Sequence, residues 1–463
     1  MSGKSATKRT PARSSETSFV SGSLVKEMLR FAGPYMLGVL VQNLYGAVDL
    51  LVVGHYATTA DVSAVTIGSQ LMNIVTQLII GFATGITVLV GQSFGAGNKK
   101  RLSTIVGTSA VLFGGAAAVL TIGYLACNNL FITMMQTPAE AQGAAREYLF
   151  ACSIGILFIT GYNIVNSILT GLGDSRTPFV FILVACAINV VLDIVLVRYF
   201  HMGALGAAIA TTVAQAGSFF FALAFLRVKG LGFALGKGDL RPERTESKNV
   251  ITIGAPVAVQ NVLVGISFLF IVAIINQMGL AASAAVGVVE KLIAFLFVPA
   301  IGMSTAVATA ASQNLGAGQP ERARKSMWYG VAMALVPSVL ICVFCQFSGE
   351  TLTALFGNDP EVIALAANYL RSYIVDVVMV AFVFSMNGYF NSCNKSWFSL
   401  VHSLITTFAL RVPLAWLFSR VENTSLYLIG WAAPLSTLAS LVLCLLFLVH
   451  LDRQEKRLAG RAG

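Results

Sequence analysis

Charged residues are scarce in this sequence. Only 11% of the 463 residues are Asp, Glu, Lys or Arg, and 56% are hydrophobic, whereas a soluble globular protein carries about 25% charged residues. This shortage excludes a soluble enzyme. The hydrophobic residues come in blocks of roughly 20 to 30, and about 20 apolar residues are enough for a helix to cross the hydrocarbon layer of a membrane. The sequence therefore predicts an all-α polytopic membrane protein.

Residues that bind metals or carry out acid–base catalysis are also few. The four histidines are dispersed, and the seven cysteines lie mostly within apolar runs without paired spacing. A zinc site or a disulfide framework needs such spacing. The breaks between the apolar blocks are short and hold no clustered His, Asp or Glu. We therefore expect no metal centre, no cofactor and no enzymatic activity.

Basic residues are unevenly placed along the chain. The net charge is +10, which in a soluble protein would suggest nucleic-acid binding. Here Lys and Arg concentrate in both tails, in the stretch Arg227 to Lys248, and in alternate breaks such as Lys99 to Arg101 and Arg322 to Lys325. By the positive-inside rule these segments are cytoplasmic. We expect a multi-pass protein of the cell's inner (plasma) membrane, with both termini cytoplasmic and no nucleic-acid partner.

Turn residues and charge clusters divide the apolar blocks into twelve helical spans. The spans begin near Phe31, Asp61, Leu102, Ala144, Thr177, Gly203, Val250, Ala281, Arg322, Glu361, Ser396 and Ser425. The predicted organisation is a cytoplasmic tail (1–28), a first lobe of six spans (29–229), a cytoplasmic linker (230–248), a second lobe of six spans (249–452) and a cytoplasmic C-terminal tail (453–463). By composition the N-terminus also fits an organellar transit peptide, but a plain tail is the simpler interpretation.

The two sets of six spans repeat one another. Gln92-Ser-Phe-Gly-Ala-Gly and Gln313-Asn-Leu-Gly-Ala-Gly lie 221 positions apart, and Gly81 and Gly302 keep the same separation. Because six spans is an even number, both halves enter the membrane from the same side and are related by a pseudo-two-fold axis along the membrane normal. Such repeats are typical of transporters, whose lobes rock about a central site.

Two carboxylates stand within the spans of the first half. A charged residue inside a membrane helix costs about 3 kcal/mol or more, so it is a functional candidate. Asp49 ends a polar stripe with Gln42 and Tyr45 on one face of the first span, which favours a substrate-facing role for Gln42 and Tyr45. The alternative is that Asp49 belongs to the outer water interface.

Asp193 lies deep in the fifth span, one turn after Asn189. The Asn amide can bind the carboxylate or offer its oxygen to a cation. Thr211 in the sixth span is a weaker candidate, because a Thr hydroxyl in a helix often bonds its own backbone. The second half has its own charged residues, Glu290, Lys291, Asp376 and Arg411, which can neutralise one another.

Two acids without a base must bind a cation or take up a proton, because an unpaired buried charge is costly. We therefore predict a coupling site for H⁺ or Na⁺ at Asp49, Asn189, Asp193 and Thr211, with Na⁺ held at Asp49, Asn189 and Asp193. The alternative is a static hydrogen-bonded cluster that holds the first and fifth spans together.

These residues resemble a known family, the multidrug and toxic compound extrusion (MATE) transporters, and within it the branch related to DinF. The segments that carry the resemblance are Pro34 to Gly54, Gly91 to Asn98, Thr170 to Pro178, Asn189 to Asp193 and Ser312 to Gly318.

The resemblance implies twelve helices in two lobes around a central cleft, and export of lipophilic or cationic drugs and metabolites in exchange for H⁺ or Na⁺. It matches the family's acid in the first span to Asp49, and the DinF-like residues to Asn189, Asp193 and Thr211. Another branch uses acids in the seventh and tenth spans. This chain has apolar residues around Val264 at the first of these places, and Asp376 stands about a turn away from the second.

Three functions are compatible with the sequence. The leading one is a cation-coupled multidrug antiporter that works by alternating access, as a monomer. A flippase for a lipid-linked precursor would share the two-lobe plan but would favour basic residues in its cavity. A polytopic membrane transferase would need a catalytic grouping on its loops.

Overall fold

The computed structural model describes residues 18–230, 232–233, 236, 238–356 and 359–462. Most of the predicted N-terminal tail, residues 1–17, lies outside this range. The helices of the first half are α1 (Leu24–Tyr56), α2 (Thr59–Gly95), α3 (Lys99–Ala126), α4 (Asn128–Met134), α5 (Gln142–Gly171), α6 (Arg176–Asp193) and α7 (Gly203–Lys229). Those of the second half are α8 (Arg244–Asn276), α9 (Leu280–Leu296), α10 (Val298–Gly316), α11 (Pro320–Thr353), α12 (Pro360–Tyr373), α13 (Val375–Ser392), α14 (Ser396–Leu404), α15 (Val412–Ser419), α16 (Leu426–Gly430) and α17 (Ala432–Ala462).

Short segments of other helical types join some of these helices. The 3-10 turns are Ala139–Ala141 before α5 and Ala354–Phe356 after α11, and π-helical segments follow α6 (Ile194–Tyr199) and α14 (Ile405–Arg411). A π-helical segment widens the backbone and is often found next to functional residues. The first of these begins directly after Asp193, and the second ends at Arg411.

The described part of the chain contains ten helices long and apolar enough to cross a membrane, and two bent pairs that bring the number of spans to twelve. The pairs are α9 with α10, bent by 40°, and α12 with α13, bent by 43°. The prediction of an all-α protein with twelve spans is confirmed. Only a helix or a closed barrel satisfies its own backbone hydrogen bonds in lipid, which is why these apolar blocks are helical.

Helix ends coincide with polar signals in the sequence. The Thr58 hydroxyl accepts a hydrogen bond from the Asp61 backbone while the Asp61 carboxylate accepts one from the Thr58 backbone, which caps α2. Asn98 caps α3 in a similar way. Gly97 and Gly318 have φ of +65° and +71° in the two repeated turns, a conformation that glycine adopts without strain. The repeated Gly-Ala-Gly motifs are therefore tight turns between helices.

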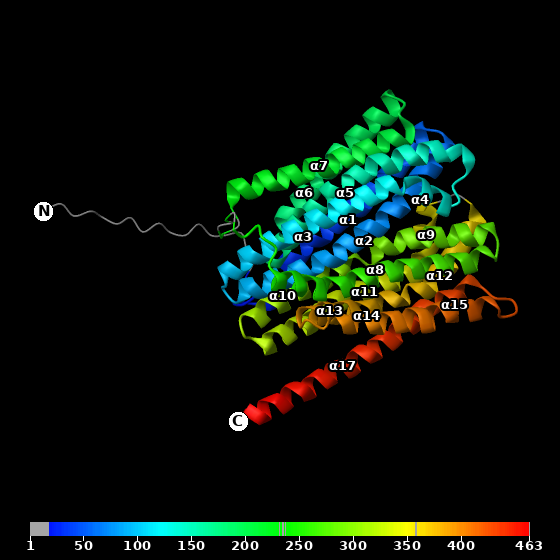
Figure 1. Cartoon of the computed structure of the whole chain (residues 1–463). Coiled ribbons are helices and arrows are strands. Elements are labelled where there is room, and N and C mark those ends of the chain that lie inside the picture. The colour runs from blue at the N-terminus through cyan, green and yellow to red at the C-terminus, as the bar shows by residue number, and fades with distance from the viewer. Residues whose placement is uncertain (1–17, 231, 234–235, 237, 357–358, 463) are drawn as a thin grey trace.

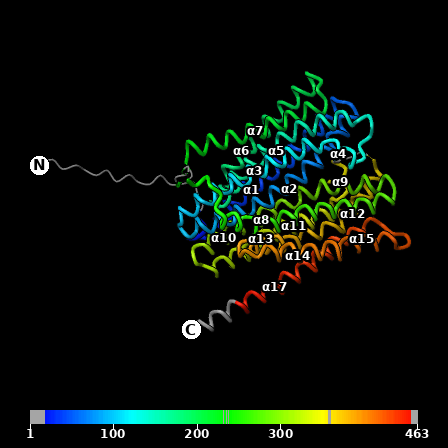
Figure 2. Tube along the Cα trace, in the orientation of Figure 1, coloured from blue at the N-terminus to red at the C-terminus, as the bar shows by residue number. Residues whose placement is uncertain are grey.

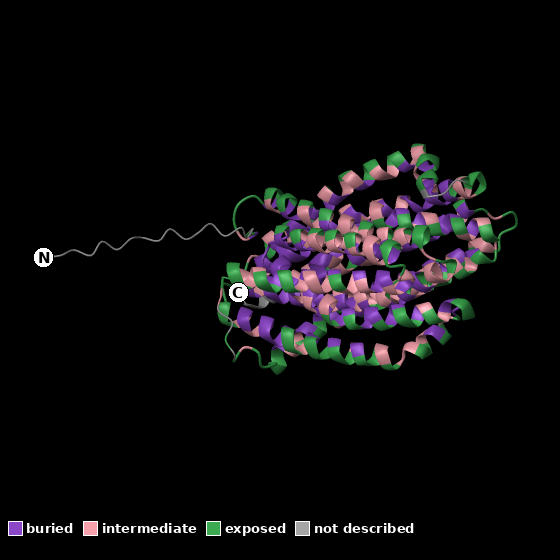
Figure 3. Cartoon of the chain, turned by 90° about the horizontal axis from the view of Figure 1, so that it is seen from above, coloured by how far each residue is buried: buried purple, intermediate pink, exposed green. Residues whose placement is uncertain are grey.

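The two halves form two lobes. Figures 1 and 2 show α1 to α7 in the upper part of the view and α8 to α17 in the lower part. The axes of most long helices are roughly aligned with one another. Buried residues gather between the helices, and exposed ones lie along the outer faces (Figure 3). The expected linker is shorter than the range 230–248, because α8 already begins at Arg244, and α17 continues through the expected C-terminal tail.

Small residues let the lobes approach closely. α2 packs on α8, where a Cβ added at Gly81 would overlap the backbone of Ala258, and one at Gly85 would press on the carbonyl oxygen of Val250. By the repeat, Gly302 on α10 meets Met36 on α1. Helices in membranes associate mainly through such close packing of small residues. The Gly81 seam is thus a main contact between the lobes.

The lobes are joined at one end of the molecule. We call it the terminal end, because α1 begins and α17 ends there; it also holds the turns 96–98, 172–175, 317–319 and 393–395 (left in Figure 1). Among the described residues, the side-chain hydrogen bonds between the lobes lie between the terminal end and the middle of the helices. Those farthest from the terminal end join Asn43 to Ala294 and Asn261 to Gln77. The lobes are therefore closed at the terminal end.

Candidate functional site

Asp49 is buried in the first lobe. It lies on α1, is only 7% exposed, and its Oδ2 accepts a hydrogen bond of 3.0 Å from the Thr211 hydroxyl on α7. Its other oxygen, Oδ1, is buried without a hydrogen-bond partner. Asp49 therefore lies inside the helix bundle rather than on its outer surface.

Asn189 and Asp193 approach the same point from α6. Both side chains are fully buried. Asn189 Nδ2 donates to Thr211 Oγ1 at 3.4 Å, while Asn189 Oδ1 and both carboxylate oxygens of Asp193 are buried without a partner that meets hydrogen-bond geometry. The Asp193 carboxyl interacts with that of Asp49. The sequence-predicted residues of three helices are therefore brought together.

The cluster contains two acids and no base. In the part of the chain that the structure describes, neither Asp49 nor Asp193 forms an ion pair, and every ion pair present joins other residues. Four oxygens without partners (Asp49 Oδ1, Asn189 Oδ1, Asp193 Oδ1 and Oδ2) remain buried among the helices. Buried polar atoms normally have partners, so these oxygens are able to accept a proton or to bind a cation. Carboxylate, amide and hydroxyl oxygens suit a hard cation such as Na⁺.

Tyr45 and Gln42 differ in position, although they share a helix face. The Tyr45 hydroxyl is buried beside Thr211 and Gln215 but lacks a partner in hydrogen-bond geometry. Gln42 is exposed, so it is not one of the buried residues of the cluster. Sequence reasoning missed Gln215. It lies four residues after Thr211 on α7, and that helical spacing was the available signal.

The charged residues of the second lobe form a separate cluster. Arg411 is buried, bonds the Tyr373 hydroxyl, and lies 4.3 Å from the centre of the Phe268 ring. Asp376 and Glu290 lie near enough to be influenced by the charge of Arg411, but none of the ion pairs in the described part of the chain joins either acid to it. Lys291 is exposed and is not part of this group. The sequence predicted that two acids and two bases neutralise one another, but this cluster has two acids, Glu290 and Asp376, and one base, Arg411.

A site for a tightly bound metal is not indicated. Within the described ranges, no three His, Cys, Asp or Glu side chains are grouped so that they can hold a metal ion. The seven cysteines are free thiols.

Comparison with known proteins identifies the family. The MatE family model matches the chain twice, over residues 34–195 and 256–417, which together make up more than half of its length. Each match falls in one half of the chain, which confirms the internal repeat. Because the family consists of transporters, the expectation that the chain is not an enzyme is also confirmed.

Individual relatives span nearly the whole chain. A Bacillus subtilis protein named as a probable multidrug resistance protein, YpnP, is 28% identical over 87% of this chain and 90% of its own length. An FAD transporter from Shewanella oneidensis is 23% identical over 92% and 94%. A solved structure described as the outward-facing conformation of a multidrug resistance MATE family transporter superposes with a TM-score of 0.89 at 21% identity, covering 95% of this chain and 98% of that one. The chain thus belongs to the MatE family of membrane transporters, with two lobes of six spans each.

Proposed function

We propose that this protein is a cation-coupled multidrug antiporter of the plasma membrane, with Asp49, Asn189, Asp193 and Thr211 as its coupling site. The observation that carries the proposal is the group of four buried oxygens without partners on α1 and α6, with two carboxylates and no base. A proton or Na⁺ neutralises one of these charges. The residues on α6 and α7 are those of the DinF-like branch, to which we assign the chain.

Charge neutralisation links the ion to movement. Asp49 stands on α1 and Asp193 on α6, so repulsion between the two carboxylates acts between these helices. A bound cation removes that repulsion and favours closer packing of α1 on α6 and α7. A ligand shifts a conformational equilibrium only by its differential affinity for the two states, and here the difference is the cation bound between the acids.

The orientation follows from charge. The terminal end carries Lys99 to Arg101 and Arg322 to Lys325, which supports a cytoplasmic position under the positive-inside rule. A closed terminal end would then make this an outward-facing state. One chain supplies both lobes, so we expect it to work as a monomer, with small molecules and the lipid bilayer as its partners.

The substrates are proposed from the relatives and from the charge of the site. Relatives named for multidrug resistance support export of lipophilic or cationic compounds and metabolites. The acids of the first lobe favour positive charge, and exposed Gln42 and partly buried Tyr45 are the residues we assign to substrate contact. The FAD transporter among the relatives makes an anionic flavin nucleotide the appropriate second probe.

The test is efflux from proteoliposomes. The purified chain is reconstituted, the vesicles are loaded with a fluorescent organic cation or with a flavin nucleotide, and H⁺ and Na⁺ gradients are imposed separately. We expect one gradient to drive efflux of the cation. Asp49→Asn should abolish this efflux, while Glu147→Gln, which removes an exposed carboxylate on α5, should keep it.

Each other outcome has a distinct meaning. Efflux that Asp49→Asn leaves unchanged would contradict the coupling site. Gradient-driven efflux of the flavin alone would replace the proposed substrate class. No efflux of either probe would contradict the multidrug proposal and favour the alternative of a flippase for a lipid-linked precursor.

A further inference from the structure

Two glutamines that occupy equivalent places in the repeat form hydrogen bonds between the lobes at the terminal end. Gln92 in the last turn of α2 donates a hydrogen bond of 2.9 Å to the carbonyl of Ser392, the last residue of α13. Gln313 in the last turn of α10 donates one of 3.0 Å to the carbonyl of Gly171, the last residue of α5. Each glutamine therefore reaches from its own lobe to the other one.

The two hydrogen bonds are related by the pseudo-two-fold axis. Gln92 and Gln313 are 221 positions apart in the sequence, and so are Gly171 and Ser392. The accepting carbonyls belong to helix C-termini, whose last carbonyl groups have no partner within the helix. Each lobe therefore offers one donor and one acceptor, and the two bonds must break together when the lobes separate at this end.

Glycines make this approach possible. A Cβ added at Gly95 would overlap the backbone carbonyl of Gln313, and one added at Gly316 would overlap that of Gln92. These are the first glycines of the two Gly-Ala-Gly turns. The turns thus do more than reverse the chain: their glycines allow each glutamine's backbone to rest on the opposite helix end.

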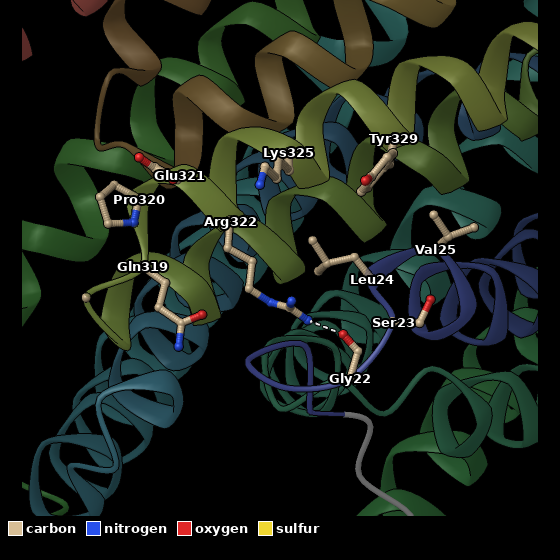
Figure 4. A pocket seen from close by; sticks show the side chains of 11 residues that line it. Gly22, Ser23, Leu24, Val25, Gln319, Pro320, Glu321, Arg322, Lys325 and Tyr329 are labelled. Carbon is tan, nitrogen blue, oxygen red and sulfur yellow. Dashed lines mark hydrogen bonds between the residues drawn. The ribbon is translucent and has the colours of Figure 1, made fainter.

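A further contact reinforces one side. The Phe19 backbone donates to Gln313 Oε1 at 3.1 Å, and the Phe19 side chain is fully buried. Arg322 bonds the carbonyls of Phe19 and Gly22. Figure 4 shows the bond from Arg322 to Gly22 across the pocket between the start of α1 and the start of α11. The segment before α1, the helix of Asp49, is therefore fastened to Gln313 of the second lobe.

We propose that Gln92 and Gln313 form a reciprocal latch whose two hydrogen bonds hold the terminal end shut, and whose release is required for the lobes to part there. This inference rests on the proposed alternating-access function but concerns different residues from the coupling site. Gln313 is fully buried, so its hydrogen bond is protected from water until the lobes separate. A three- to tenfold change in the ratio of separated to closed molecules corresponds to about 0.6 to 1.4 kcal/mol, which lies within the net contribution of one hydrogen bond.

The test measures the separation of the lobes directly. Spin labels are placed at the exposed, repeat-related positions Lys100 and Glu321 in the full chain after the seven native cysteines are replaced, and the distance distribution is recorded without substrate or ion gradient. We expect Gln92→Ala and Gln313→Ala each to raise the ratio of separated to closed molecules roughly three- to tenfold. The double variant should raise it more than either.

A matched control separates the latch from a general loss of packing. Gln346→Ala removes a glutamine hydrogen bond to the carbonyl of Arg371, which lies within the second lobe, and should leave the distance distribution unchanged. A distribution in both latch variants identical to that of the parent would overturn the proposal. So would an equal shift in the Gln346 variant.

A second variant guards against misfolding. Gln92→Glu is nearly isosteric, but its carboxylate cannot donate to the Ser392 carbonyl, whereas its protonated form can. At high pH the terminal end of this variant should be more separated than that of the parent measured at the same pH, and at low pH this difference should disappear. Absence of this pH dependence would also overturn the latch. Because the measurement needs no transport, a failed efflux experiment with normal latch behaviour would count against the proposed function alone.

Discussion

The Thr211 hydroxyl connects α7 to the buried acid of α1: it donates to Asp49 Oδ2 at 3.0 Å and accepts from Asn189 at 3.4 Å. A Thr in a helix often bonds its own backbone, but here its hydroxyl bonds a carboxylate in another helix. The hydroxyl therefore orients the carboxylate and leaves Asp49 Oδ1 and the Asp193 oxygens without partners, as the proposed cation site requires.

Replacing Thr211 should weaken ion binding without unfolding the protein. Thr211→Val keeps the shape of the side chain but removes the donor to Asp49, and hydrogen bonds to charged groups contribute about 1.5 to 3 kcal/mol. We expect the ion concentration at half-maximal efflux to rise by roughly tenfold or more. Thr211→Ser retains the hydroxyl and should remain within about threefold of the parent. Equal values for the Val and Ser variants would show that the hydroxyl plays no part.

Neutralising Asp193 should abolish transport without lowering the thermal stability. Asp193→Asn removes one of two adjacent buried carboxylates and with it the electrostatic cost of an unpaired charge. We expect thermal stability in detergent to stay the same or to rise, while gradient-driven efflux is lost. The melting temperature can be read from loss of the monodisperse peak after heating. A large fall in that temperature would instead support a static cluster that holds the helices together.

Removing Arg411 should lower the thermal stability but leave the coupling ion unchanged. Arg411→Met leaves buried Asp376 and partly buried Glu290 without the nearby base whose charge offsets theirs, and an uncompensated buried charge is costly. We expect a clear loss of thermal stability, partly restored in the double variant with Asp376→Asn. The ion that drives efflux should not change. A changed ion requirement in Arg411→Met would show that the second lobe takes part in coupling.

The seam between α2 and α8 should tolerate no added side chain at Gly81. Gly81→Ala places a methyl group against the Ala258 backbone, and overpacking of this kind costs about 1 to 3 kcal/mol. We expect a lower melting temperature and a shift in the distance between the lobes. Gly123→Ala on α3, which has open space for a Cβ, is the matched control and should behave as the parent. Identical melting curves for the two variants would show that close packing at Gly81 does not stabilise the contact between α2 and α8.

The sequence predicted the spans well because the membrane leaves few choices. An apolar block of sufficient length must be helical in lipid, so all twelve spans could be placed from polar breaks alone. The helical spacing on α1 also predicted that Tyr45 and Asp49 share a face. The repeat was visible because the turns that contain Gly97 and Gly318 kept both their residues and their spacing.

Features that depend on how helices meet were harder to predict. Glu290 and Lys291 are adjacent in the sequence, but neighbouring side chains on a helix point in different directions, so Glu290 is partly buried within the influence of Arg411 while Lys291 is exposed. The bend between α9 and α10 falls beside Pro299, whereas the bend at Ile374 has no proline or glycine beside it. The hydrogen bonds of Gln92 and Gln313 cross between lobes, and no spacing within one helix reveals their partners.

Both bent pairs of helices lie in the second lobe. Straight α2 and α5 occupy the places in the repeat that the broken pairs α9 with α10 and α12 with α13 occupy in the other lobe. A break in a helix is the place where it flexes at least cost, so the second lobe has two internal joints at positions where the first has continuous rods. The second lobe can therefore flex within single spans at these two points, whereas the movement that we propose in the first lobe is between whole helices, of α1 against α6 and α7.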